Sequence, residues 1–267
     1  MRGSRIAAIV LRQVFLLRGS PVRLLPMIAW VAIDIVLWGF ITKYLSAISP
    51  AGFRLVPALL GAVLLWDFLT RVMQGVTMAF FEDVWSRNFL NVFATPLRIS
   101  EYLTGLVATS ICTSLIGLVV MLAVAGLAFG LSFLVYGAAL IPFVMILFVT
   151  GVSLGILGAA IVLRFGPASE WLIWPIPGLL SPFAGVYYPI HTLPGWMQAI
   201  AHGLAPSYVF EGMRAIVAGH GVPGGQLAIG AGLAALYLGG ACLTFAAVFR
   251  YAIRTGLIAR YSAESVS

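Results

Sequence analysis

The sequence predicts an all-α integral membrane protein, and three observations lead to that fold class. Hydrophobic residues make up 62% of the 267-residue chain, only 9% of its residues are charged, and its mean hydropathy is +1.08. Soluble domains carry roughly a quarter charged residues. Long apolar stretches recur along the chain, and about 20 such residues cross a hydrocarbon core as a helix. We therefore expect one membrane domain over residues 1–267, without a soluble domain.

The first 23 residues predict a helix that lies at the membrane interface. Five arginines fall in this segment, and Arg5 and Arg12 are seven residues apart among Ile, Val and Leu. Residues seven apart share one face of an α-helix, so the pattern is typical of a basic amphipathic helix on a membrane surface. The arginines also interrupt the apolar run, and we expect no cleavable signal peptide.

Six apolar stretches follow, and each is expected to cross the membrane. They run over about 24–41, 56–81, 102–127, 140–163, 171–188 and 227–249. The fifth stretch is punctuated by Pro175, Pro177 and Pro182. Proline interrupts regular helical hydrogen bonding, so the boundaries of this span are among the weakest. The connection between the third and fourth spans is itself apolar and equally weak.

The distribution of basic residues predicts the orientation of these spans. With the N-terminus inside, eleven arginines fall in inner segments, whereas the outer segments hold only Lys43, Arg54 and Arg214. Basic residues are enriched on the cytoplasmic side of membrane proteins. We expect both termini, and the segment 82–101, to be cytoplasmic. The net charge of +7 then needs no nucleic acid partner to explain it.

The polar segment 82–101, between the second and third spans, predicts a short amphipathic helix. Acidic residues open it, where they suit a helix N-terminus, and a proline closes it. An ordinary connector between two spans is the alternative. Its candidate functional residues are Glu82, Asp83, Arg87, Phe89, Leu90 and Pro96.

Three charged residues fall inside the predicted spans, where a charge normally faces protein or water. Asp67 and Arg71 are four residues apart, so they lie on one helix face and can neutralise each other. The alternative is that they line a conduit. Asp34 has no partner in its own span and must reach one elsewhere.

Two GxxxG patterns, Gly126 with Gly130 and Gly151 with Gly155, predict close helix approach. With 29 glycines in an apolar chain, this signal is weak.

The chain lacks the motifs of an enzyme. A phosphate-binding loop needs a lysine after a glycine-rich turn, and Lys43, the only lysine, has no such context. His191, His202 and His220 do not have metal-ligand spacing, so we expect no metal and no catalytic residues. If ATP drives this protein, another subunit must bind it.

The predicted outer loop 189–226 differs from the other loops because it mixes Trp196, Met197 and Phe210 with several prolines. Such a segment suits short helices that dip into the outer leaflet and return. Irregular backbone at that depth must be covered by protein or water. An exposed loop is the alternative.

The chain resembles the membrane subunit of type-2 ABC exporters, and three features carry the resemblance. The first is the basic N-terminal helix ahead of six spans. The second is the cytoplasmic segment with Thr95-Pro96-Leu97-Arg98 and Glu101 to Gly105, which is similar to a family signature. The third runs from the end of the fifth span into the following loop and comprises Ser181-Pro182, Gly185, Tyr187-Tyr188-Pro189, Leu193-Pro194, Trp196, Pro206 and Glu211 to Arg214.

The resemblance implies a mechanism and partners. Two permease copies, a homodimer or pseudo-dimer, would bind two cytoplasmic ABC ATPase subunits, which hold ATP and Mg²⁺. The helix near 84–94 would be the coupling helix that docks on an ATPase. The conduit would form between the two copies in a bacterial inner membrane, and the substrate would be a lipid-like, glycan or hydrophobic small molecule. The re-entrant hairpin would comprise Pro182, Gly185, Tyr187, Tyr188, Pro189, Glu211 and Arg214. An ion-coupled secondary transporter or channel is the alternative.

Overall fold

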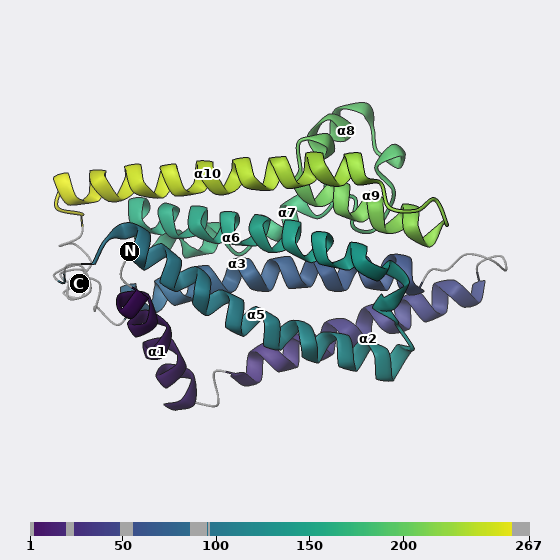
Figure 1. Ribbon diagram of the computed structural model, residues 1–267, viewed down its shortest axis with the longest axis horizontal. Helices are drawn as coiled ribbons and strands as arrows, with labels where there is room; N and C mark the ends of the chain where they lie inside the picture. The colour runs from purple at the N-terminus through teal and green to yellow at the C-terminus, as the bar shows by residue number, and fades with distance from the viewer. Residues whose placement is uncertain (1–2, 20–23, 49–55, 86–94, 96, 258–267) are drawn as a thin grey trace.

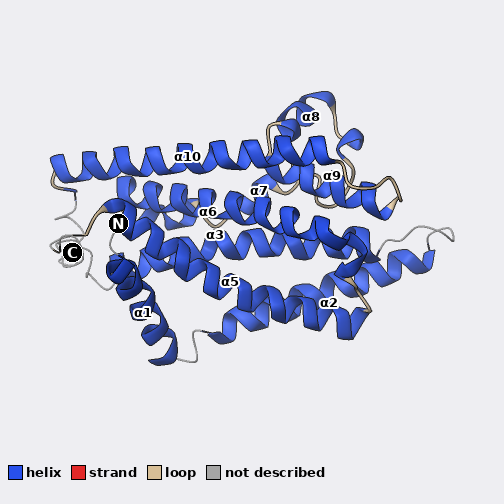
Figure 2. Cartoon of the chain, viewed as in Figure 1, coloured by secondary structure: helices blue, strands red, loops and turns tan. Residues whose placement is uncertain are grey.

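The computed structural model describes residues 3–19, 24–48, 56–85, 95 and 97–257, and within these ranges it contains helices and no strand (Figure 2). Four helical stretches are long and apolar enough to cross a membrane: 58–85, 99–129, 133–165 and 224–254. Helix α2 (Leu24–Ile48) has 25 residues and therefore also has the length of a span. The all-helical membrane fold is thus confirmed, whereas the count of six spans stays a prediction.

Two helices form the middle of the bundle. Helix α3 (Gly61–Trp85) packs against α6 (Leu140–Phe165), α5 (Ile99–Phe129) covers the other side of α3, and α10 (Gly224–Arg254) packs on α6. Figure 1 shows the same order across the molecule. The apolar windows of α3 and α6 are mostly buried inside the chain, whereas those of α5 and α10 are mostly exposed. The outer helices therefore present apolar side chains to their surroundings, as lipid-facing helices do.

The contact between α3 and α6 depends on two glycines. A Cβ atom added at Gly151 would lie 2.7 Å from the carbonyl oxygen of Leu69, and one at Gly155 would lie 2.7 Å from the Cβ of Val76. The prediction that this GxxxG pair permits close helix approach is confirmed. The other pair acts differently, because Gly130 ends α5 with a left-handed φ of 64°. Gly126 meets only ordinary contacts, so this second pair is a helix end and not a packing seam.

Helices α1 (Gly3–Gly19) and α2 pack on α5, and α1 crosses one end of the bundle (Figure 1). A π-helix, η2 (Val56–Leu60), precedes α3, and a 3-10 helix, η3 (Phe133–Ala139), joins α5 to α6. The predicted N-terminal helix is confirmed as a helix. Residues 20–23 of that predicted segment lie outside the described ranges.

The stretch 171–188, which we expected to be the fifth span, is not one continuous helix. It contains the end of the 3-10 helix η4 (Pro167–Leu172), the five-residue helix α7 (Ile176–Leu180) and a series of turns. Pro175, Pro177 and Pro182 lack the backbone N–H that a helix interior needs, and this explains the breaks. The interruption by prolines that the sequence indicated is therefore confirmed, whereas a membrane crossing by this stretch stays a prediction.

The segment 189–226 folds into short helices at the end of the bundle opposite α1 (Figure 1). These are the 3-10 helix η5 (Ile190–Thr192), α8 (Gly195–His202) and α9 (Ala205–Val217), and α10 begins at Gly224. Helix α9 packs on α6 and α10, with Phe210 and Met213 fully buried. The predicted short helices are confirmed, whereas their depth in a membrane stays a prediction.

Candidate functional site: an ion-paired junction beside residues 86–94

The predicted coupling segment 82–101 begins in the last turn of α3 and ends in the first turn of α5. Helix α3 continues to Trp85, so Val84 and Trp85, which we assigned to a separate coupling helix, belong to α3. Of the predicted coupling residues, Glu82 and Asp83 lie in the last turn of α3. The others, Arg87, Phe89, Leu90 and Pro96, lie outside the described residues.

Asp83 points into the protein and pairs with α1. Its Oδ1 lies 2.5 Å from Nη2 of Arg12, and the hydroxyl of Tyr102 donates a hydrogen bond of 2.8 Å to its Oδ2. The Asp83 side chain is only 1% exposed, whereas that of Arg12 is 30% exposed. A carboxylate this buried is stable only with partners of this kind. Asp83 therefore acts inside the chain and not on its surface.

Glu101 forms a second pair with α1, 96 residues away in the sequence. Nη1 of Arg5 lies 3.1 Å from its Oε2, and the backbone N–H of Arg98 donates to the same oxygen at 3.1 Å. Glu101 is in the first turn of α5 and Arg98 immediately precedes that helix. A carboxylate in this position satisfies a backbone N–H and complements the helix dipole. Glu101 therefore fixes the start of α5 and also binds α1.

Apolar packing aligns α1 with these two acids. Arg5, Ile9 and Arg12 follow one another at helical spacing, so they share one face of α1. Ile9 is buried, and a Cβ atom at Gly105 of α5 would lie 2.8 Å from its side chain. The absence of a side chain at Gly105 thus lets α1 approach α5 closely. We call this set the α1 junction; its members are Arg5, Ile9, Arg12, Asp83, Glu101, Tyr102 and Gly105.

The α1 junction links α1 to α3 and to α5, the helices that precede and follow residues 86–94 in the sequence. Removing one partner of a buried ion pair costs about 3–5 kcal/mol. A displacement of the ends of α3 and α5 therefore displaces α1 with them, or else breaks these pairs. The sequence showed the shared face of Arg5 and Arg12 but not its partners. Its only signal was that an acid stands near each end of the coupling segment.

A second polar cluster lies within the predicted spans. Nε of Arg71 bonds Oδ2 of Asp67 at 2.7 Å, which confirms the predicted pairing. Asp34 of α2 interacts electrostatically with both residues, so the structure brings all three predicted intramembrane charges together. A Cβ atom at Gly117 of α5 would lie 3.7 Å from the side chain of Arg71. The cluster therefore lies among α2, α3 and α5, with two carboxylates for one guanidinium.

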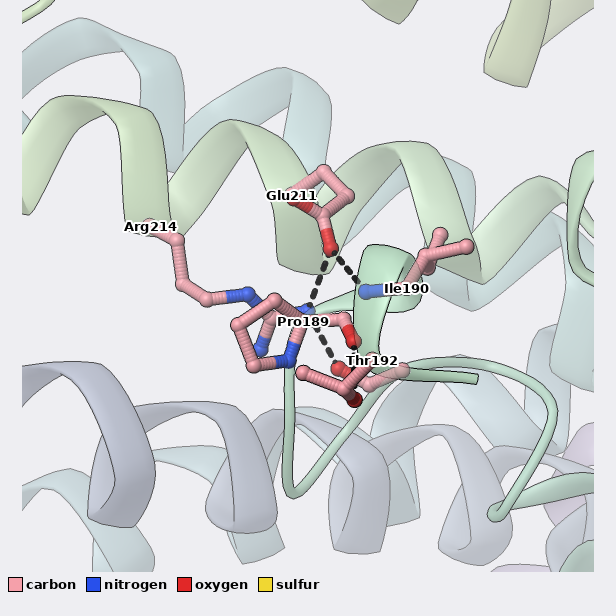
Figure 3. A network of polar contacts seen from close by, with 6 residues as sticks. Pro189, Ile190, Thr192, Glu211 and Arg214 are labelled. Atoms are coloured by element: carbon pink, nitrogen blue, oxygen red, sulfur yellow. Dashed lines mark hydrogen bonds and ion pairs between the residues drawn. The ribbon is translucent and has the colours of Figure 1, made fainter. Parts of the chain in front are cut away.

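The third predicted set lies at the far end of the bundle. One carboxylate oxygen of Glu211 accepts hydrogen bonds from the backbone N–H of Ile190 (2.8 Å) and from Nη2 of Arg214 (3.0 Å). The same nitrogen of Arg214 donates to the carbonyl oxygen of Gly185 at 2.5 Å. Figure 3 shows Glu211 and Arg214 reaching from α9 toward Pro189, Ile190 and Thr192. Side chains of helix α9 thus bind the backbone of residues 185–190, which precede it in the sequence.

The remaining residues of this set shape the same turn. Gly185 has a left-handed φ of 69°, which favours glycine. The hydroxyl of Tyr188 donates to the carbonyl oxygen of Pro182 at 2.9 Å, and Tyr187 stacks on Trp38 of α2, with ring centroids 5.2 Å apart. The carbonyl oxygen of Pro189 accepts the Thr192 hydroxyl at 2.7 Å. All seven predicted hairpin residues therefore lie around one turn.

Comparison with known families bears on what this arrangement does. The family model described as "ABC-2 type transporter" matches residues 8–218, well over half of the chain. The chain belongs to the ABC-2 type transporter family. It is therefore a transmembrane permease of an ABC transporter and a multi-pass membrane protein, a component that is not itself catalytic. Membership also implies an ABC ATPase subunit as its partner. A comparison with curated proteins finds no match.

Proposed function

We propose that this permease exports a lipid-like, glycan or hydrophobic small molecule across a bacterial inner membrane. Two permease copies would bind two cytoplasmic ATPase subunits, which hold ATP and Mg²⁺, and each copy would cross the membrane six times with both termini inside. The family supports the permease role and the ATPase partner. The excess of arginine in the inner segments supports the orientation.

The α1 junction is the observation that carries the proposed coupling mechanism. The ATPase would push on residues 86–94, whose two flanking helices are both ion-paired to α1. Because α3 packs closely on α6 through Gly151 and Gly155, a displacement of α3 reaches the middle of the bundle. In this mechanism the ends of α3 and α5 move with α1 as one unit, and the interface between the two copies opens.

This mechanism divides the predicted coupling residues into two groups. Residues in 86–94, with Arg87, Phe89 and Leu90, would contact the ATPase. Asp83, which is buried and bonded to Arg12 and Tyr102, would instead transmit the displacement within the chain. Substitutions in the first group should weaken ATPase binding. Substitution of Asp83 should leave binding intact and weaken transport.

An ion-coupled transporter is the second candidate, and the cluster of Asp34, Asp67 and Arg71 is the observation that favours it. Among the described residues of this cluster there are two carboxylates and one guanidinium, and an acid in excess of the basic groups is where a proton or a cation could bind. ABC family membership favours ATP as the energy source, so within the first proposal this cluster would stabilise the contact among α2, α3 and α5.

Purification and transport assays test the proposed function. The complete chain is isolated from its native membrane, and we expect an ABC ATPase to co-purify. The complex is then placed in vesicles, and movement of a fluorescent amphiphile is measured with ATP or with an imposed pH gradient. Transport that needs ATP and is absent with the gradient alone supports the proposal. Transport that needs only the gradient would contradict it and support the ion-coupled candidate.

A further inference from the structure

The ends of α6 and α10 form a basic corner that the mechanism does not use. Arg164 is in the last turn of α6 and Arg254 is in the last turn of α10, and these two helices pack together. The guanidinium of Arg164 lies 4.2 Å from the ring centroid of Tyr251, and Arg254 is three residues beyond that tyrosine. Residues three apart on a helix are neighbours, so the two arginines flank one exposed aromatic ring.

The two arginines of this corner differ from the four described arginines that form ion pairs. Arg5, Arg12, Arg71 and Arg214 each form an ion pair with a carboxylate. Within the described residues, Arg164 and Arg254 have none. Arg164 is held by ring faces, since Phe165 also lies 5.8 Å from it. Contact through the face of a guanidinium leaves its in-plane N–H donors available, and these suit the oxygens of a phosphate.

Apolar surface adjoins these donors. Phe165 is 70% exposed, and Tyr251 is 43% exposed. Both belong to the ends of helices that are long and apolar enough to cross a membrane. If these helices span the bilayer, the corner lies where hydrocarbon meets the headgroups. Cationic donors above exposed aromatic rings complement a molecule with an anionic head and an apolar tail.

We propose that the corner formed by Arg164, Phe165, Tyr251 and Arg254 binds an anionic phospholipid. The two guanidinium groups hold the headgroup phosphate, and the aromatic rings contact the first part of the acyl chains. This site is separate from the α1 junction and does not depend on the direction or the substrate of transport. Its effect is to anchor the ends of α6 and α10 to the lipid at that membrane surface.

Native mass spectrometry of the purified full-length chain tests the proposal. The chain is titrated with phosphatidylglycerol or with phosphatidylcholine of the same acyl chains. We expect the wild-type chain to retain phosphatidylglycerol preferentially. The double variant Arg164→Gln/Arg254→Gln should bind it roughly tenfold more weakly, since each basic residue near an anionic surface favours binding severalfold. The double variant Arg164→Lys/Arg254→Lys keeps both charges and should lose less.

Lys43→Gln is the matched control, because it removes an exposed positive charge from α2 and should leave lipid binding unchanged. Equal retention of the two lipids by the wild type would overturn the proposal. So would undiminished phosphatidylglycerol binding by the Gln double variant. If that variant keeps its lipid but no longer co-purifies with the ATPase, the corner faces that subunit, and the lipid assignment is likewise overturned.

Discussion

Arginine–carboxylate pairs stabilise both ends of the bundle. At one end the pairs join separate helices, whereas at the other end the pair lies within one helix and binds a neighbouring turn. At one end, Arg5 and Arg12 bind acids 96 and 71 positions away, and those acids are almost fully buried. At the other end, Glu211 and Arg214 are three residues apart, partly exposed, and bind the backbone of the preceding turn. The first arrangement attaches a separate helix to the bundle, whereas the second fixes a local turn. In the proposed mechanism, only the first transmits a displacement between distant segments.

The largest effect should come from removing an arginine at the α1 junction. Arg12→Ala removes the guanidinium that pairs with the buried carboxylate of Asp83, and we expect a loss of about 3 kcal/mol in stability. Arg214→Ala, at the other end, leaves a carboxylate that solvent reaches and should cost about 1 kcal/mol. Thermal unfolding of the two purified variants measures the difference. Equal falls in the unfolding midpoint would contradict the distinction between the two ends.

A smaller loss of stability should come from changing the backbone conformation, and not a charge, at the hairpin end of the bundle. Gly185→Ala places a side chain at a φ of 69° and within 3.0 Å of Ile190, and we expect it to cost about 1–2 kcal/mol. Gly178→Ala is the control, because a Cβ atom there meets nothing within 4 Å. Limited proteolysis near residues 185–190 should accelerate only in the Gly185 variant. Unchanged cleavage would show that this turn tolerates a side chain.

The smallest effect should come from the hydroxyl of Tyr102. Tyr102→Phe removes one hydrogen bond to Asp83 while Arg12 stays in place, and the expected loss of stability is about 1 kcal/mol. Tyr44→Phe is the control, because Tyr44 is exposed. If Tyr102→Phe lowers the unfolding midpoint as far as Arg12→Ala, the hydroxyl and not the ion pair holds Asp83.

The sequence predicted elements better than it predicted partners. Apolar length predicted α2, α3, α5, α6 and α10, and the prolines in 171–188 marked where helical structure is interrupted. These features depend on neighbouring residues and on the thickness of a membrane. Two kinds of feature could not be predicted: the role of a glycine pair and the pairing of charges. A GxxxG pattern does not reveal whether its glycines lie in a helix or end one, and Gly130 ends α5.

The pairing of charges could not be predicted for a related reason. Arg5 and Arg12 were expected to face a membrane surface, because they share one face of a basic amphipathic helix. Their partners come from the ends of α3 and α5, and only the packing of α1 on α5 brings them together. Asp34 is a similar case, since its neighbours belong to α3. The i,i+4 pair of Asp67 and Arg71 was predicted because both residues are on one helix.

The most direct test of the account is the amount of substrate transported per ATP hydrolysed by the complex of this permease with its ATPase. Asp83→Asn keeps the shape of the side chain but removes the charge that binds Arg12, whereas Glu211→Gln makes the same change at the other end. Both variants should still bind the ATPase. Transport per ATP should fall severalfold in Asp83→Asn and stay near the wild-type value in Glu211→Gln. A wild-type ratio in Asp83→Asn, with the ATPase bound, would contradict the role of the α1 junction in coupling.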